Sequence, residues 1–167
     1  TDITYNFPSL GRAIATGPGG ILYAGAFASG VYKFNGVNNW TIVGTAMPNN
    51  FVFKMTVAAN DTIYVACNSN NVFRCHTSGG SWVSANTGLP ATDATFIFAD
   101  AQNKLFIGNN TSPGVLYRSV NNGDNWSLVS SGIRRLGCVR MKLPTSRSSV
   151  KPCVPLPTVT TSIVDGP

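Results

Sequence analysis

The chain has 167 residues, of which 43% are hydrophobic, so it is long and apolar enough to bury a core of its own. Only 11% of the residues are charged, glutamate is absent, and Gly, Asn, Ser and Thr separate short runs rich in Val, Ile, Tyr and Phe. This texture excludes wholesale disorder and is typical of an all-β, turn-rich protein.

The net charge of +6 is distributed unevenly along the chain. Six of the twelve Lys and Arg residues lie in residues 134–167, whereas residues 1–133 carry six basic and five acidic side chains. A nucleic-acid binder usually builds a basic stripe into its fold, so we expect no nucleic-acid partner.

Several features favour an exported protein. No apolar stretch approaches the ~20 residues that a membrane-spanning helix needs, so we expect no membrane span. The chain starts without Met and without a signal peptide, as a mature or excised piece would. Its low charge and its abundance of Asn and Thr favour a secreted or cell-surface location.

The strongest signal is an internal repeat, because Trp40, Trp82 and Trp126 are spaced by 42 and 44 residues. Two apolar runs precede each Trp, at residues 21–25 and 31–33, 63–67 and 72–74, and 105–108 and 116–118. A further apolar run follows Pro48 and Pro90, each eight residues after a Trp. Each unit therefore predicts four short strands joined by tight turns, which is the period of a propeller blade.

In chain order, this repeat predicts five segments. They are the outer strand of a preceding blade (1–7), blade 1 (8–47), blade 2 (48–89), blade 3 (90–133) and a basic, Pro-rich tail or linker (134–167). The last segment has five prolines and no blade periodicity.

The residues that lead into each Trp resemble the Asp-box, the Ser-x-Asp-x-Gly-x-x-Trp hairpin of bacterial sialidases, sortilin and xyloglucan-degrading propellers. The best match is residues 119–126, Ser-Val-Asn-Asn-Gly-Asp-Asn-Trp, in which Asn replaces the Asp. Residues 75–82 retain only the Gly and the Trp, with Thr at the position of the acid, and the copy that ends at Trp40 is one residue short.

The resemblance implies an all-β fold of three four-stranded antiparallel blades, either a partial β-propeller or one completed by an oligomer, with an irregular tail. In the family the box closes a hairpin at the periphery of the blade, away from the face where ligands bind. A structural role is therefore implied for Trp40, Thr77, Gly79, Trp82, Ser119, Asn121, Gly123 and Trp126.

The four cysteines permit three disulfide connectivities. If residues 68–71 form the loop of a regular hairpin, Cys67 faces Val72 and Cys75 faces Tyr64, which disfavours a bridge between the two thiols. We expect both to be small buried residues, with Cys67 at the place of Gly25 and Gly108 in the other units.

Cys138 and Cys153 are a candidate disulfide if the compartment is oxidising. His76 is the only histidine, and a zinc site needs about four ligands. Neighbours on a strand point to opposite faces, which disfavours a metal site shared by His76 and Cys75. We therefore expect no metal and no cofactor.

Glycoside hydrolysis needs two carboxylates across a sugar. Asp61 and Asp100 fall in expected turns and Asp124 in the box, so turn roles are expected for all three. Asp93 lies on a connection between blades, which lines the ligand face in propellers, so it is a possible ligand-face residue. A sialidase would also need a glutamate, which is absent, and no catalytic residue is assigned.

Three hypotheses for function follow. The leading one is a non-catalytic extracellular propeller module that binds a protein or a glycan, or that serves as a scaffold. The second is a fragment of a polysaccharide-degrading propeller glycoside hydrolase whose catalytic acids lie in other blades. The third is a self-assembling subunit of a surface filament or ring, in which copies of the chain are its partners.

Overall fold

The computed structural model of the chain describes residues 6–8, 10–37, 39–68, 71–90, 94–109 and 115–129. The chain divides into two units, residues 1–133 and 134–167, and all described residues belong to the first. The expected tail, with Cys138 and Cys153, and the candidate Asp93 lie outside the described residues. Within the described ranges, no helix is long and apolar enough to cross a bilayer.

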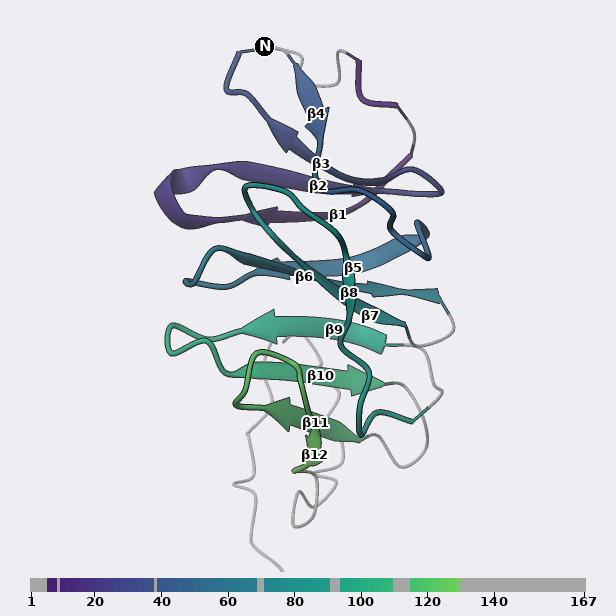
Figure 1. The fold of residues 1–167 in the computed structure, drawn as a ribbon, viewed down its shortest axis with the longest axis vertical. Helices are drawn as coiled ribbons and strands as arrows, with labels where there is room; N and C mark the ends of the chain where they lie inside the picture. Colours follow the sequence, from purple (N-terminus) through teal and green to yellow (C-terminus); the bar gives the residue numbers. More distant parts are fainter. Residues whose placement is uncertain are drawn as a thin grey trace, which may run out of the picture. The chain divides into compact units, whose positions relative to one another are not determined.

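The described residues form three antiparallel sheets of four strands each (Figure 1). Blade 1 contains β1 (Gly11–Thr16), β2 (Leu22–Ala26), β3 (Gly30–Phe34) and β4 (Trp40–Ile42). Blade 2 contains β5 (Val52–Val57), β6 (Thr62–Cys67), β7 (Val72–His76) and β8 (Val83–Ser84). Blade 3 contains β9 (Ala94–Ala99), β10 (Leu105–Asn109), β11 (Leu116–Ser119) and β12 (Ser127–Leu128). Three four-stranded antiparallel blades were expected, and this prediction is confirmed.

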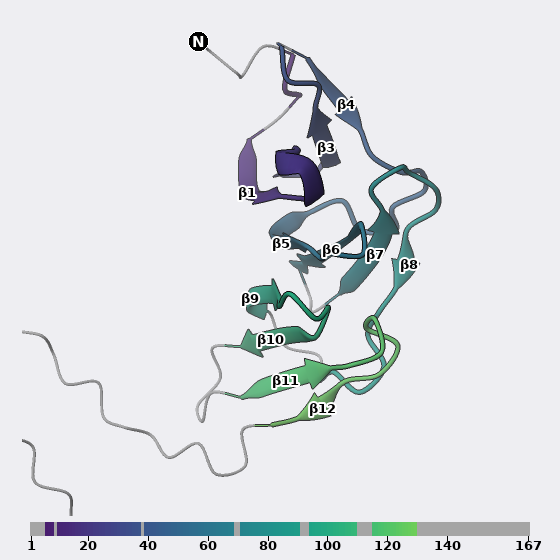
Figure 2. The ribbon, with the colours of Figure 1, turned by 90° about the vertical axis from the view of Figure 1, so that its left-hand side faces the viewer.

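Each sheet is a meander, because its strands pair in chain order. The first strands of the blades, β1, β5 and β9, contact one another, whereas β4, β8 and β12 lie at the opposite side of the sheets (Figure 2). A meander needs only tight turns, and the polar turn residues supply the required backbone: Asp61 and Asn103, each just before a second strand, have φ of 59° and 60°.

The strand registers align the three blades residue by residue. Tyr23, Tyr64 and Phe106 hold the same position, since they pair with Lys33, Arg74 and Arg118 on the third strands. On this alignment Cys67 corresponds to Ala26, and Ala66 corresponds to Gly25. The expected place of Cys67 was wrong by one residue, because the first box is one residue shorter than the second.

The hairpin that carries the two described cysteines also differs from expectation. Ile63 pairs with Cys75, and the N–H of Cys67 donates to the carbonyl of Asn71 at 2.8 Å. The expected register, with Cys75 opposite Tyr64, was wrong by one residue because Asn71 belongs to the hairpin rather than to its loop. The thiols of Cys67 and Cys75 are nevertheless free and buried, as expected.

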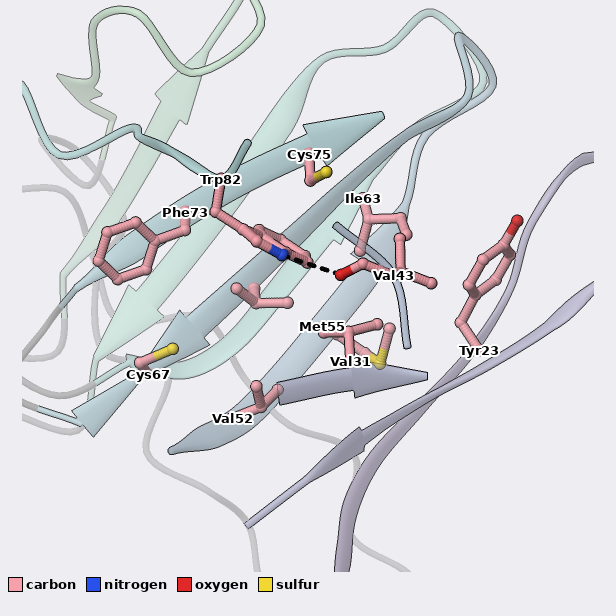
Figure 3. Close-up of a cluster of buried hydrophobic side chains, with 11 residues drawn as sticks. Tyr23, Val31, Val43, Val52, Met55, Ile63, Cys67, Phe73, Cys75 and Trp82 are labelled. Atoms are coloured by element: carbon pink, nitrogen blue, oxygen red, sulfur yellow. Dashed lines mark hydrogen bonds between the residues drawn. The ribbon is translucent and has the colours of Figure 1, made fainter. Parts of the chain in front are cut away.

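The hydrophobic cores lie between the blades rather than within them. One core joins blades 1 and 2 around Tyr23, Val52 and Trp82 (Figure 3), and a second joins blades 2 and 3 around Tyr64, Leu105 and Trp126. Each blade is therefore stabilised by its neighbours, because a single four-stranded sheet cannot bury both of its faces.

The buried Cys67 thiol leads to a chemical prediction. Its side chain is 2% exposed, and burial raises its pKa from 9.0 to about 12. Only the thiolate attacks disulfide reagents, so this rise lowers the reactive fraction near neutral pH about a thousandfold. We expect a variant that retains Cys67 alone to react with an aromatic disulfide reagent only after unfolding in urea. Rapid reaction of the folded variant would contradict this.

Candidate ligand-binding face

The hairpin of residues 119–126 is held by its own side chains. Ser119 Oγ accepts a hydrogen bond from the N–H of Gly123 at 2.9 Å, and Asn121 Oδ1 accepts one from the N–H of Asn125 at 3.1 Å. Gly123 has φ of 83°, and an added Cβ would lie 3.2 Å from Ala85 Cβ of blade 2. Glycine therefore permits both the turn and the close approach of the neighbouring blade.

The other two hairpins are shaped by different contacts. In residues 75–82, the N–H of Thr77 donates to the carbonyl of Asp61 at 2.8 Å, and Gly79 has φ of 102°. In residues 34–40, Asn35 Oδ1 accepts hydrogen bonds from two turn N–H groups, both at 3.0 Å. The assignment of the three hairpins to the Asp-box family stays a prediction.

Two of the repeated tryptophans tie neighbouring blades together. Trp82 Nε1 donates to the carbonyl of Val43 at 3.0 Å, and Trp126 Nε1 donates to that of Ala85 at 2.8 Å. Val43 and Ala85 follow β4 and β8, so each bond reaches back to the preceding blade. The indoles are 6% and 5% exposed, so each combines a large buried apolar area with a satisfied N–H.

Trp40 is met by the N-terminal residues instead. The backbone N–H of Trp40 donates to Asn6 Oδ1 at 3.1 Å, and the ring centroid of Trp40 lies 5.0 Å from that of Phe7. Asn6 also has φ of 53°, close to the 54° of Ala46 in the connection between blades 1 and 2. The segment 6–8 thus repeats part of an interblade connection. That residues 1–7 are the outer strand of a preceding blade stays a prediction.

The three box hairpins share one edge of the blades with the turns between first and second strands; we call it the box edge. Asn60 Nδ2, in such a turn, donates to Asn122 Oδ1 of the third hairpin at 3.1 Å. Tyr64 Oη donates to the carbonyl of Asn122 at 3.2 Å, and burial raises the pKa of this phenol, so it stays a donor. Arg74 and Asp124 form an ion pair at 2.6 Å beside them.

An open depression of about 310 Å³ lies at this interblade contact. The side chains of Arg74 and Asp124 are 24% and 56% exposed, so solvent screens their ion pair, which contributes at most about 1 kcal/mol. The polar side chains there already bond to one another. We therefore assign the box edge to joining blades.

The described carboxylates all belong to this edge. Asp100 Oδ1 accepts hydrogen bonds from the N–H groups of Gln102 and Lys104 at 2.9 and 2.8 Å, and Asp61 Oδ1 accepts one from Thr77 Oγ1 at 3.4 Å. With Asp124 paired to Arg74, each carboxylate has a local partner. Among the described residues, no three His, Cys, Asp or Glu side chains gather as cation ligands.

The opposite edge holds the turns between second and third strands and the connections between blades; we call it the connection edge. Near it, the first strand of each blade has a β-bulge at the same register position. The extra residues are Arg12, Phe53 and Thr95. A bulge redirects a side chain, so the three blades present three different groups from equivalent places.

Four side chains at this edge form what we call the aromatic cluster: Arg12, Phe27, Phe51 and Phe53. The ring of Phe27, which follows β2, meets those of Phe51 and Phe53 edge-on, with centroids 4.9 and 6.3 Å apart. The Arg12 guanidinium carbon lies 5.1 Å from the Phe27 centroid and 5.8 Å from that of Phe53. Arg12 is exposed and the rings are half-buried. Within the described residues, no carboxylate pairs with Arg12.

A depression of about 390 Å³ lies at the contact of blades 1 and 2, and none of the four side chains of the aromatic cluster lines it. Its walls are the turn at Ser29 and Gly30 and the connection from Val43 to Asn50, next in sequence to Phe51. This volume is within the range of ligand sites, which combine apolar walls with a few polar groups. The aromatic cluster gives the connection edge an apolar platform with a cation, and the depression is a separate recess between blades 1 and 2.

The site residues named from sequence do not meet at one place. The box residues lie at the box edge or between blades, and Asp93, two residues before the third bulge, is outside the described residues. Sequence reasoning missed Arg12, Phe27, Phe51 and Phe53. A bulge shifts the in–out alternation of a strand by one residue, but a short apolar run such as residues 51–53 does not show this shift. Arg12, one of six basic residues before residue 134, was a usable signal.

No protein-family model matches the sequence, and no curated protein sequence matches it. Solved structures are similar in fold. A GH74 enzyme of Niastella koreensis matches with a TM-score of 0.59 and 22% identity over 74% of this chain and 18% of its own. The extracellular domain of BT4673 from B. thetaiotaomicron matches with 0.59 and 20% over 77% and 18%. YCF48 bound to a D1 peptide matches with 0.55 and 13% over 71% and 39%.

These similar structures are β-propellers, and the chain spans less than a fifth of the first two. At such identities the likeness concerns the fold alone. Together with the three meander sheets, whose first strands adjoin, it shows that the described part of the chain is three consecutive blades of a β-propeller.

Proposed function

We propose that the chain is a non-catalytic, extracellular β-propeller module that binds a protein or glycan ligand at its connection edge. The observation that carries this proposal is the aromatic cluster. It combines an exposed guanidinium with half-buried rings, and two of its four side chains, Arg12 and Phe53, stand on bulged strand ends. Rigid strands are better platforms for recognition than loops, since their side chains are already positioned.

The chemistry of the cluster suits a ligand that offers a carboxylate next to an apolar surface. A guanidinium stacked on rings still presents N–H donors at its rim, and it binds carboxylates with two parallel hydrogen bonds. Ring faces accept aliphatic side chains or the C–H face of a sugar. Acidic peptides and uronic-acid glycans both meet this description.

An extracellular location is supported by the low charge of the sequence and by the similarity in fold to the extracellular domain of BT4673. The alternative, a fragment of a polysaccharide-degrading enzyme, has the GH74 similarity in its favour. It needs two carboxylates across a sugar, whereas the described ones sit in turns at the box edge. A catalytic role of Asp93 would support the glycoside hydrolase alternative.

The test is a binding screen with the full chain on two immobilised sets, acidic peptides and uronic-acid oligosaccharides, followed by titration of any hit. Saturable binding to one set supports the proposal and names the class of ligand. Release of reducing ends from xyloglucan, lost in an Asp93→Asn variant, would replace it by the enzyme hypothesis. No saturable binding in either set would contradict it.

Substitutions in the aromatic cluster sharpen this test. We expect Arg12→Ala and Phe53→Ala each to weaken binding of the identified ligand about tenfold or more, as central contact residues do. Lys54→Ala is the matched control, because Lys54 is exposed on the same strand but points to the other face. Equal loss in all three variants would contradict a site at the cluster.

A further inference from the structure

The two ends of the blade array leave faces uncovered that are buried between blades elsewhere. On blade 1, Ile14 is 64% exposed, whereas Met55 and Ile97, at the same register position, are 8% and 7% exposed. Leu22 is half-buried, and its counterpart Ile63 is fully buried. We call this side of blade 1 the leading face.

The far side of blade 3, the trailing face, is similarly open. Phe96 and Phe98 are 44% and 53% exposed. Phe106 is half-buried there, although Tyr23 and Tyr64 at the same position are 1% and 0% exposed. Both faces thus carry the apolar residues of an interblade contact without the blade that would cover them.

The packing at one position says which blade would fit the trailing face. In the contact of blades 1 and 2, the space above Gly25 is filled by Val52 of the following blade, because an added Cβ would overlap Val52 Cγ1. In the contact of blades 2 and 3, alanine occupies both positions: Ala66 in the place of Gly25 and Ala94 in the place of Val52, within one core. A larger residue on one side is therefore matched by a smaller one on the other.

On the trailing face this space is already occupied. In blade 3 the position of Gly25 is held by Gly108, and an added Cβ on Gly108 would overlap the ring of Phe96 from the same blade. A blade that follows must therefore bring a small residue to the place of Val52. The first strand of blade 1 has glycine there, Gly11, which pairs with Ala26 as Val52 pairs with Cys67. An added Cβ at Gly11 would lie 3.6 Å from Phe7 Cε1, so the ring of Phe7 borders this space.

We propose that the leading face of a second copy of this chain packs on the trailing face of the first. The contact is head to tail, with Ile14 in the buried place of Met55 and with Phe96 against Gly11 and the neighbouring ring of Phe7. Propellers close with about four to eight blades, and two copies of three blades give six. A head-to-tail contact that closes makes a ring, so the product is a two-fold symmetric dimer with two identical interfaces.

The test is the native mass of the full chain, by native mass spectrometry and light scattering. We expect a mass twice the 17.6 kDa of one chain, unchanged on dilution over the measured range. A mass of one chain at every concentration would overturn the proposal, and would favour further blades of a longer protein as the cover. A series of growing masses would overturn the closed ring.

Charged substitutions identify the surface. Phe98→Lys on the trailing face and Ile14→Lys on the leading face should each give monomers, with the dissociation constant raised on the order of a hundredfold. Val83→Lys is the matched control, since Val83 is 51% exposed but lies on blade 2. It should stay dimeric. Unchanged circular dichroism shows that each variant is folded, and a folded Phe98→Lys dimer would overturn the proposal.

Mixing the two monomeric variants tests the head-to-tail geometry. The Ile14→Lys chain keeps an intact trailing face, and the Phe98→Lys chain keeps an intact leading face. Their mixture should form a heterodimer through one intact interface, visible in native mass spectrometry as one chain of each mass. Failure to form it would contradict a head-to-tail contact, because that contact needs only one good face from each chain.

Discussion

Replacing Trp82 by alanine is expected to lower the free energy of unfolding by about 3–5 kcal/mol, the usual loss for a large buried aromatic side chain. Trp82 is 6% exposed in the core between blades 1 and 2, and its N–H bonds to Val43 of the preceding blade. The substitution therefore opens a cavity and removes a bond between blades. Urea denaturation followed by circular dichroism measures the effect.

Two further variants separate the causes of this loss. Trp82→Phe keeps most of the apolar volume but leaves the carbonyl of Val43 without its donor, so we expect a smaller loss of about 1–3 kcal/mol. Val83→Ala, at the exposed neighbouring position, should change stability by less than about 0.5 kcal/mol. If Trp82→Ala cost no more than Val83→Ala, the indole would not join the blades.

Replacing Gly44 by alanine is expected to cost about 3 kcal/mol. Gly44 has φ of 73°, and a left-handed backbone costs an alanine about 1–2 kcal/mol. Its Cβ would also lie 2.7 Å from Trp82 Nε1, 2.8 Å from the carbonyl of Gly80 and 2.9 Å from Cys75 Sγ. Overpacking of this kind adds about 1–3 kcal/mol, because the bond between Trp82 and Val43 must shift.

Gly19 provides a closely matched control for this clash. Its φ is 71°, and an added Cβ would meet nothing within 4 Å. Gly19→Ala should therefore show the backbone cost alone, about 1–2 kcal/mol. The difference between the two variants, measured by the same urea denaturation, isolates the close approach of blades 1 and 2. Equal losses would mean that the Cβ at Gly44 is accommodated.

The blade repeat could be predicted from sequence because a tryptophan recurs in every unit, and in two of the three units it has the same structural role. Trp82 and Trp126 each bury an indole against the preceding blade, so their spacing reports the spacing of the blades. Strand positions followed from apolar runs between turn residues. The one-residue error at Cys67 has a local cause, since alignment from Trp40 ignored the shorter first box.

The candidate site could not be predicted in the same way. Arg12 lies on β1 and Phe27 directly follows β2, both in blade 1, but Phe51 and Phe53 come from the connection and first strand of the next blade. Their meeting depends on β-bulges, which shift the register by one residue, a shift that short apolar runs do not reveal. The sequence suggested Asp93 as a ligand-face residue because it lies on a connection between blades, and this role stays a prediction.

The all-β class, the three blades and the four strands of each could be predicted from the amino-acid pattern, because they depend on local turn chemistry and on the periodic burial of apolar side chains. The meeting of the aromatic cluster at the connection edge and the exposure of Ile14 and Phe98 depend instead on tertiary packing. Arg74 and Asp124 are 50 residues apart, and Ile14 differs from Met55 in exposure, not in character. Such differences arise from what packs against a residue, which no local pattern records.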